Sequence, residues 1–217
     1  MPQDNTLPII RAYDDWIVRA YSTVRFHILR QRFLDEIGQY LPASGKVLDI
    51  GCGFGLFSLY YARQYPQLDL SGLDLSPRRI AMAQAAADRL TVSNVRYAVR
   101  DAGDLKLDEQ YQCIYLLDLI HHLPVPAVRP LLERLHAALA PGGRLLIKEV
   151  DTRPRYKMWF TWFLDQLMDR RATVRYWPQS ELAALLSEVG FENYRHALVD
   201  YLPYPHVLFI CRKRTGS

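Results

Sequence analysis

A glycine-rich turn near residue 50 carries the residues best suited to hold a ligand. The sequence VLDIGCGFGLF places Gly51, Gly53 and Gly55 in one turn, with Asp49 two residues before it. Glycine has no Cβ, so a ligand can approach the backbone of such a turn closely. A carboxylate beside the turn favours a cation such as an ammonium or sulfonium and repels a pyrophosphate. A dinucleotide-binding turn would need a further glycine where Leu56 stands.

Two more acids follow the next two expected strands. Asp74 ends the strand-like part of LSGLDLSP, and Asp101 follows the run VRYAV. The first can accept two ribose hydroxyls at once, as in nucleotide-binding Rossmann-like folds. The second can accept a hydrogen bond from the exocyclic amine of adenine. Each acid alone could be an ordinary turn or cap residue. Together they favour one ligand site, because parallel strands end at the same edge of a sheet.

These residues need a sheet to position them. Strand-like and helix-like runs alternate from residue 46 to 150, which predicts a parallel sheet with helices on both faces. Ser76 and Pro77 mark a helix start, since serine caps helices and proline fits the first helical position. A helical pattern over 13–37 precedes the sheet. The other expected elements are strands at 46–50, 69–75, 95–99, 113–117 and 145–150, a helix at 126–139 closed by Pro141-Gly142-Gly143, helices at 157–171 and 180–189, and strands at 191–199 and 206–212.

The last two strands are expected to form a hairpin, so the final strand would run antiparallel, at a sheet edge or inserted within the sheet.

Five segments resemble, in order and spacing, the motifs of class I S-adenosylmethionine-dependent methyltransferases. They are VLDIGCGFG, LSGLDLSP, VRYAVRDAGDL, YLLDLIHHLP and LAPGGRLLIKE. The resemblance covers roughly residues 45–150. It implies an α/β, Rossmann-like fold with a seven-stranded, mostly parallel sheet, helices on both faces and an antiparallel last strand.

The resemblance also implies S-adenosylmethionine as the cofactor and one methyltransferase domain over residues 1–217. That domain would consist of a helical cap at 1–44, a cofactor-binding core at 45–150, and substrate-side helices and final strands at 151–217. Leu75 would flank the adenine, with Ala102 opposite it. The positions that match cofactor contacts of the family are Asp49, Gly51, Gly53, Asp74, Asp101 and Asp118.

Two histidines follow the fourth expected strand, on the rim where the methyl group should emerge. A neutral imidazole there could act as a general base for a hydroxyl acceptor. Similar small-molecule enzymes often carry such a pair, with the second member packed inward. We therefore expect His121 to be the base and His122 to be structural, although both could be structural. Glu149 or Asp151 could orient a histidine, bind the acceptor, or be a solvated loop acid. Lys148 interrupts an apolar strand and has no firm interpretation.

Aromatic residues are dense in two segments that could contact an acceptor. The expected helix at 157–171 carries Trp159 and Trp162 on an apolar surface wider than docking on a sheet requires. A lid over an apolar or aromatic acceptor would explain it, as would core packing, a dimer contact or a membrane-surface contact. Tyr13 and Tyr21 in the N-terminal helical pattern could close over the site. Tyr176 and Trp177 could contribute as well.

The acceptor is expected to be small. The Asn/Asp-Pro-Pro-Tyr/Phe run of nucleobase amine methyltransferases is absent after the fourth strand, where Asp118-Leu-Ile-His stands instead. No added domain that would grip a macromolecule is expected. We expect methylation at oxygen of an apolar or aromatic metabolite, as in secondary metabolism or the synthesis of quinone-like or polyene lipids. The alternatives are N- or C-methylation, or a noncatalytic domain that binds the cofactor.

Composition limits the partners. The 217 residues carry a formal charge of +4 and half are apolar, which indicates an ordinary globular core. The basic residues are scattered, so nucleic acid is not expected, although an acceptor tethered to an acidic carrier protein would suit the charge. The three widely spaced cysteines suggest no metal site and reduced thiols in a cytoplasm. No apolar run approaches the length of a membrane span. A monomer or a homodimer is expected.

Overall fold

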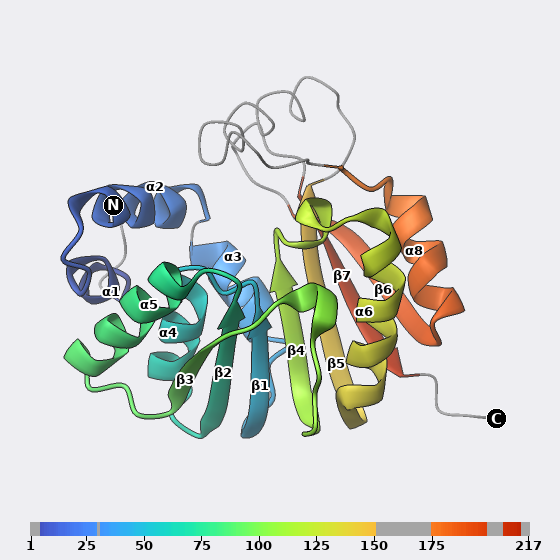
Figure 1. The fold of residues 1–217 in the computed structure, drawn as a ribbon, viewed down its shortest axis with the longest axis horizontal. Helices are drawn as coiled ribbons and strands as arrows, with labels where there is room; N and C mark the ends of the chain where they lie inside the picture. Colours follow the sequence, from blue (N-terminus) through green and yellow to red (C-terminus); the bar gives the residue numbers. More distant parts are fainter. Residues whose placement is uncertain (1–4, 30, 151–174, 199–205, 214–217) are drawn as a thin grey trace. The chain divides into compact units, whose positions relative to one another are not determined.

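The computed structural model describes residues 5–29, 31–150, 175–198 and 206–213. The expected aromatic helix at 157–171 lies outside these ranges. The strands form a seven-stranded sheet with the order β3-β2-β1-β4-β5-β7-β6. The chain divides into two compact units, residues 1–102 and 103–217. Figure 1 shows the elements of both units.

The first unit contains three helices before the sheet and two within its α/β part. Its elements are α1 (Leu7–Arg11), α2 (Trp16–Ile28), α3 (Gln31–Gly38), β1 (Gly45–Ile50), α4 (Leu56–Gln64), β2 (Leu68–Asp74), α5 (Pro77–Arg89) and β3 (Val95–Val99). The strand β2 pairs in parallel with β1 on one side and with β3 on the other. The helices α4 and α5 both contact β2 and β3. The predicted alternation of strand and helix is confirmed here.

The helix start at Ser76 is also confirmed, because the Ser76 hydroxyl accepts a hydrogen bond from the Arg79 N–H at 3.3 Å. The continuous helix expected over 13–37 is wrong. A new helix begins at Trp16, where the Asp15 carboxylate accepts hydrogen bonds from the backbone N–H groups of Ile17 and Val18. That helix ends before Leu29, whose backbone leaves the helical region. The apolar periodicity persists through these breaks, which is why the sequence does not reveal them.

The second unit holds the other four strands. Its elements are β4 (Tyr111–Leu117), a 3₁₀ turn η2 (Ile120–His122), α6 (Val125–Ala138), β5 (Leu139–Val150), α8 (Gln179–Glu188), β6 (Phe191–Leu198) and β7 (His206–Lys213), after a 3₁₀ turn η1 (Ala102–Asp104) at the unit boundary. The strand β7 runs antiparallel to both β5 and β6 and lies between them. The reversed last strand is thus confirmed, in the inserted position.

One boundary in this unit differs from the sequence prediction. The strand β5 begins at Leu139 rather than 145, so the Pro141–Gly143 segment lies inside it. The pairing of β4 with β5 shifts register between Tyr111 and Cys113, and Gly142 has a φ of 73°. An irregular strand that contains proline and glycine looks like a turn in the sequence, because those residues usually interrupt pairing.

The helices α6 and α8 cover one face of the second unit's strands (Figure 1). The Asn193 amide donates hydrogen bonds to the Ala183 carbonyl and the Ser187 hydroxyl of α8. The Phe191 ring meets the His136 ring of α6 edge-on, with centroids 4.8 Å apart. Residues 191 and 193 of β6 share a face because side chains alternate along a strand. Both helices therefore pack on that face, and β4, β5 and β7 are buried almost throughout.

Candidate cofactor and catalytic sites

In the glycine-rich turn of the first unit the three glycines have left-handed backbone conformations, and the turn is hydrogen-bonded to β2. Gly51, Gly53 and Gly55 have φ values of 76°, 56° and 77°, a region that residues with a Cβ rarely adopt. The N–H groups of Gly51 and Cys52 both donate to the Leu73 carbonyl, at 2.7 and 2.9 Å. The backbone conformation therefore favours glycine at all three positions, whatever side chains surround them.

Two of these glycines also differ in their surroundings. A Cβ at Gly55 would lie 2.6 Å from the Tyr97 hydroxyl, so glycine there permits close packing inside the unit. A Cβ at Gly53 would have no atom within 4 Å. Open space above Gly53 is what a ligand that approaches the backbone needs.

Asp74 at the end of β2 is held in place by that same turn. Its Oδ2 accepts the Gly53 N–H at 3.0 Å, and its Oδ1 accepts the Ser76 N–H at 2.9 Å. The Arg79 guanidinium lies 3.9 Å from the carboxylate. A carboxylate has about four acceptor positions, so both oxygens can still accept a ribose hydroxyl. The arrangement fits the predicted role of Asp74.

The end of β1 adds a second buried acid. Asp49 is 2% exposed and Asp74 is also buried. Burial raises the pKa of the Cys52 thiol well above its usual range, and the negative charges of Asp49 and Asp74 raise it further. The turn is therefore a region of negative potential. Such a region fits a ligand with a sulfonium and an ammonium, and disfavours a pyrophosphate.

The remaining predicted contacts of the first unit have different exposures. Leu75 is 66% exposed, as a residue that offers its side chain to a planar ring should be. Ala102 is half-buried and Asp101 is exposed. The Arg100 N–H donates to the Asp74 carbonyl at 3.0 Å, which connects the end of β2 to the segment after β3. The contacts of Leu75, Asp101 and Ala102 with a cofactor stay predictions.

Tyr13 and Tyr21 both contact the glycine-rich turn through Phe54. The Tyr13 hydroxyl donates to the Phe54 carbonyl at 2.7 Å, and the Tyr13 ring is buried. Burial raises the pKa of the Tyr13 phenol well above its usual range. The Tyr21 and Phe54 rings meet edge-on at 5.7 Å. The N-terminal segment thus supports the turn, and acceptor binding by these tyrosines stays a prediction.

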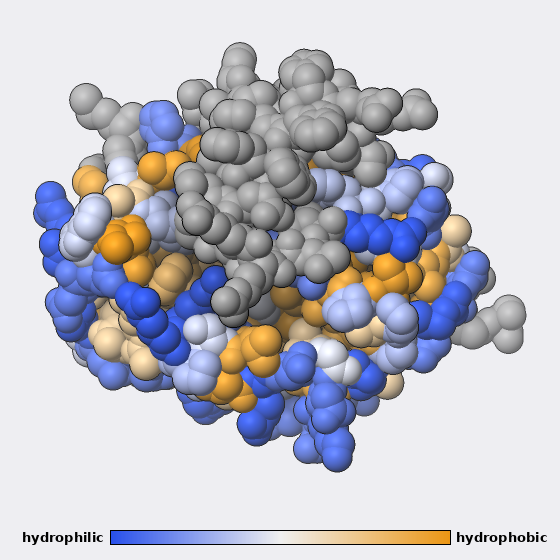
Figure 2. Space-filling view, turned by 45° about the horizontal axis from the view of Figure 1, so that its top comes forward, coloured by the Kyte–Doolittle hydropathy of each residue, from blue (hydrophilic) through white to orange (hydrophobic). Residues whose placement is uncertain are grey.

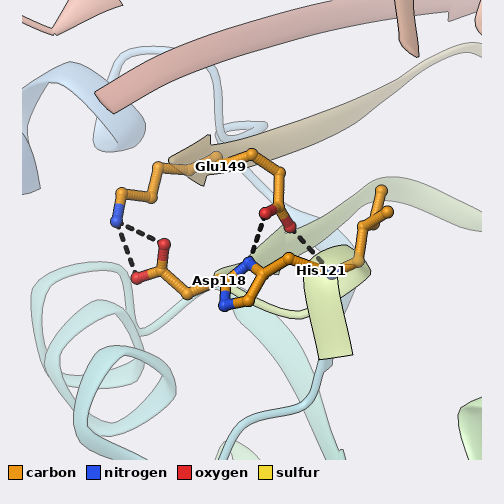
Figure 3. A network of polar contacts seen from close by, with 5 residues as sticks. Asp118, His121 and Glu149 are labelled. Carbon is orange, nitrogen blue, oxygen red and sulfur yellow. Dashed lines mark hydrogen bonds and ion pairs between the residues drawn. The ribbon is translucent and has the colours of Figure 1, made fainter. Parts of the chain in front are cut away.

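In the second unit, His121 and Glu149 form a buried pair. The His121 Nδ1 lies 2.5 Å from Glu149 Oε2, and Glu149 Oε1 accepts the Ile120 N–H at 2.7 Å (Figure 3). The exposed fractions are 1% for His121 and 3% for Glu149. Of the roles left open for Glu149, the structure supports orientation of a histidine. A carboxylate on Nδ1 fixes the ring so that Nε2 is the remaining nitrogen for proton transfer.

The burial of the two neighbouring histidines is the reverse of our expectation. His122 is exposed and His121 is buried, so the prediction that His122 packs inward is wrong. The two rings lie 4.2 Å apart by centroid. The Tyr176 ring covers His121 at 5.5 Å, and the Arg175 N–H donates to the His121 carbonyl at 2.9 Å. The 3₁₀ turn η2, which follows β4, carries the pair.

Asp118 and Lys148 form a second pair beside the first. The Lys148 Nζ lies 2.5 and 2.6 Å from the two Asp118 oxygens, and the Lys148 side chain is 0% exposed. Asp118 has a φ of 61°, and its N–H donates to the Lys148 carbonyl at 2.9 Å. The sequence placed Asp118 among the cofactor contacts and left Lys148 without an interpretation. Only the three-dimensional structure reveals the partner of each.

Some predicted residues cannot be placed. Trp159, Trp162 and Asp151 lie outside the described ranges. Within the ranges that are described, no group of three or more His, Cys, Asp or Glu side chains could hold a metal ion. No helix there combines the length and apolar character needed to cross a membrane.

Residues 22–196 match the family model described as a methyltransferase domain. The match covers most of the chain, so the protein belongs to the methyltransferase domain family. The fold and the acid-flanked glycine turn are those that the sequence predicted for a class I S-adenosylmethionine-dependent methyltransferase.

Curated relatives with similar sequences are named as O-methyltransferases. A ubiquinone biosynthesis O-methyltransferase of Xylella fastidiosa is 31% identical over 128 residues, 58% of this chain and 50% of that protein. One from Acinetobacter baylyi is 27% identical over 129 residues, 58% of this chain and 52% of its own length. A demethylspheroidene O-methyltransferase of Rhodobacter capsulatus is 35% identical over 104 residues, 48% of this chain and 25% of that protein. The chain spans about half the length of the first two relatives.

Solved structures support the fold. An O-methyltransferase family protein from Burkholderia thailandensis superposes with a TM-score of 0.72 at 18% identity, covering 95% of this chain and 63% of its own. The complex of DhpI with SAH gives a TM-score of 0.69 at 18% identity, covering 98% of this chain and 97% of that one. At such identities the likeness shows the fold alone.

Proposed function

We propose that this methyltransferase methylates a hydroxyl oxygen of a small, apolar or aromatic acceptor, with His121 as the general base. The observation that carries the proposal is the buried His121–Glu149 pair, whose second carboxylate oxygen is fixed by the Ile120 N–H. When bound, the cofactor supplies an electrophilic methyl group on a sulfonium. A hydroxyl is a weak nucleophile, so removal of its proton during attack accelerates transfer.

The proposed step moves one proton and one methyl group. The acceptor O–H bond breaks as its proton passes to His121 Nε2, and an oxygen–carbon bond forms. The bound sulfonium would be the methyl donor, and its sulfur would keep the electron pair of the carbon–sulfur bond. Glu149 stabilises the imidazolium that results, because a carboxylate on Nδ1 favours the charged ring. Its hydrogen bond from Ile120 stops the carboxylate from turning away. An imidazole oriented in this way is the arrangement that acid–base catalysis needs.

The cofactor positions form part of the proposal. In the first unit, Asp74 would accept the ribose hydroxyls, Gly53 would leave room beside the backbone, and Asp49 would attract the cationic portion. Leu75 and Ala102 would flank the adenine, and Asp101 would accept its amine. In the second unit we assign Asp118 to the cofactor from the family resemblance. The open side of Gly53 and the two backbone hydrogen bonds to Asp74 support the first three assignments.

Two observations support oxygen as the methylated atom. The curated relatives cited above carry O-methyltransferase names, at 27–35% identity. A buried histidine–carboxylate pair is more useful to a hydroxyl, which must lose a proton as it attacks, than to a neutral amine, which already has a free electron pair. We assign Trp159 and Trp162 to the acceptor side from the sequence, and an acceptor tethered to an acidic carrier protein stays within the proposal because the chain is mildly basic.

Turnover with labelled cofactor tests the proposal. Purified protein and methyl-labelled S-adenosylmethionine would be incubated with matched acceptors that differ only in a phenol, an aniline or an active methylene, free or attached to a carrier protein. We expect label in the phenol product, as a methyl ether identified by mass spectrometry, and loss of that product with His121→Asn. Label only on nitrogen or carbon would contradict the oxygen assignment. Cofactor binding without turnover of any class would favour a noncatalytic role.

A further inference from the structure

The Tyr97 side chain of β3 extends across the neighbouring strand towards the glycine-rich turn. Tyr97 lies in register with Gly72 of β2, the strand between β3 and β1. A Cβ at Gly72 would lie 2.5 and 2.6 Å from two carbons of the Tyr97 ring, closer than real Cβ contacts come. The ring therefore lies over Gly72, in space that any larger residue would fill.

The Tyr97 hydroxyl lies at the last glycine of the turn. It is 3.0 Å from the Ser58 hydroxyl of α4 and donates to the Gly55 carbonyl at 3.4 Å. The Ser58 hydroxyl also donates to that carbonyl, at 3.3 Å. A Cβ at Gly55 would lie 2.6 Å from the Tyr97 oxygen. Gly55 and Gly72 together thus form a slot that admits the Tyr97 side chain.

The Tyr97 phenol keeps its proton in this slot. Removal of the phenol from water raises the pKa of Tyr97 well above its usual range, and the hydrogen bond with Ser58 lowers it by less. A neutral hydroxyl donates one hydrogen bond and can accept others. One of the two hydroxyls can therefore donate to the Gly55 carbonyl while the other donates to its partner.

The end of the turn at Gly55 has to be held through its backbone. Glycine has more conformational freedom than any other residue, and Gly55 is the left-handed N-cap of α4, with a φ of 77°. The hydrogen bonds described above connect the other end of the turn, from Gly51 to Gly53, to β2 and to the acid that ends it. The hydroxyls of Tyr97 and Ser58 contact the Gly55 carbonyl and hold the second end.

The hydroxyl, more than the ring, calls for an explanation. Phenylalanine would fill the same slot without a polar group, and burial of a polar group is unfavourable unless it is hydrogen-bonded. In Tyr97 that polar group lies at the carbonyl where the glycine-rich turn becomes α4. What the hydroxyl adds is a connection between β3 and the turn.

We propose that Tyr97 is a positioning residue for the cofactor, whose hydroxyl holds the Gly55 end of the glycine-rich turn in the conformation that binds S-adenosylmethionine. A turn that is already held in its bound conformation loses less freedom on binding, so the affinity is higher. The inference rests on the proposed function, which places the cofactor at Gly53 and Asp74. Tyr97 acts through Gly55 and is assigned no contact with the cofactor.

Tyr97→Phe tests the inference, because it keeps the ring in the slot and removes the hydroxyl. Calorimetry with S-adenosylmethionine and with its demethylated product should show Kd raised about three- to tenfold, the net effect of one or two hydrogen bonds. Amide hydrogen exchange over residues 51–57 of the cofactor-free protein should be faster in the variant than in wild type, while exchange in β1 and β2 stays unchanged.

Tyr60→Phe is the matched control. Tyr60 is a buried tyrosine of α4, and its hydroxyl accepts a hydrogen bond from the Gln31 side chain of α3 at 2.7 Å. This variant removes a tyrosine hydroxyl away from the turn, so it should lower the melting temperature and leave both the cofactor Kd and the exchange over residues 51–57 unchanged. The same pattern in Tyr97→Phe would mean that Tyr97 is merely structural and would overturn the inference.

Ser58→Ala keeps the test valid if Tyr97→Phe does not fold. It removes the other hydroxyl at the Gly55 carbonyl, so Kd should rise in the same direction, by a smaller factor because Tyr97 still contacts that carbonyl. An unchanged Kd in this variant would then overturn the inference. Asp74→Ala distinguishes the two proposals: if it too left Kd unchanged, the proposed cofactor positions would fail. A Kd that rises in Asp74→Ala but not in Tyr97→Phe would remove Tyr97 alone.

Discussion

The glycine-rich turn of the first unit and the charged turn of the second are built in opposite ways. The first is made mainly of backbone: three left-handed glycines, a carboxylate held by two N–H groups, and open space above Gly53. The second is made of side chains, with Lys148, His121 and Glu149 almost fully buried. A backbone site can bind a ligand that many enzymes share, whereas a side-chain site fixes charges for one particular step.

The surfaces also show that exposure alone identifies neither site. Figure 2 shows hydrophobic and hydrophilic residues interspersed on the face that it presents, and several large apolar side chains are exposed, among them Trp16, Ile17 and Tyr194. Scattered apolar residues of this kind are normal on protein surfaces. What separates the two turns from the rest is the burial of their charged groups and the hydrogen bonds that fix them.

The largest expected effect is on catalysis in the charged turn. His121→Ala should lower kcat by ~10²–10⁴-fold, the usual contribution of a general base, with little change in cofactor affinity. His122→Ala is the matched control, because His122 is adjacent but exposed, whereas His121 is buried and contacts Glu149. Steady-state kinetics and cofactor calorimetry on both variants check this. Equal losses for the two histidines would contradict the distinction that burial makes between them.

The next effect concerns stability of the same turn. Lys148→Met should lower the free energy of unfolding by up to about 3–5 kcal/mol, because it removes a fully buried ammonium from the half-buried Asp118 carboxylate. Replacing both residues, by Lys148→Met with Asp118→Leu, should recover most of that loss. Urea unfolding of the single and double variants measures the difference. If the double variant were as unstable as the single one, the loss would not come from an uncompensated charge on Asp118.

Sequence reasoning succeeded where a local backbone rule decides the structure. The left-handed glycines and the Ser76 cap each follow from a requirement that is visible within a few residues, and the order of strands and helices follows from periodicity. The same reasoning failed where long-range contacts decide. Whether His121 or His122 faces inward, and which acid Lys148 meets, depends on how β4 and β5 align, and no local pattern contains that alignment.

A smaller effect is expected in the backbone-built turn. Asp74→Ala should weaken binding of S-adenosylmethionine by about 1.5–3 kcal/mol, the scale of hydrogen bonds to a charged group. Asp69→Ala is a suitable control, since it removes an acid from β2 whose contact is an exposed pair with Arg96. Calorimetry with the cofactor, its demethylated product and NAD checks both variants. Tighter binding of NAD than of S-adenosylmethionine would contradict the interpretation of the turn.

The smallest effect concerns a histidine of the second unit that lies outside the charged turn. Burial lowers the pKa of His136 below its usual value, and the charge of Lys213 lowers it further. A lowered pKa means that the folded state favours the neutral ring, so the unfolded state binds more protons as the pH falls. The stabilisation is complete above the pKa of the unfolded state, near 6.5, and decreases as the pH falls from there towards the pKa of the folded state.

Thermal unfolding of wild type and His136→Leu would be measured between pH 8 and pH 5. The melting temperatures should diverge only on the acidic side, where wild type loses more stability than the variant. A difference that grew towards alkaline pH would have the wrong sign. If turnover of His136→Leu kept the wild-type pH profile, the role of this histidine would be confined to stability, in contrast to that proposed for His121.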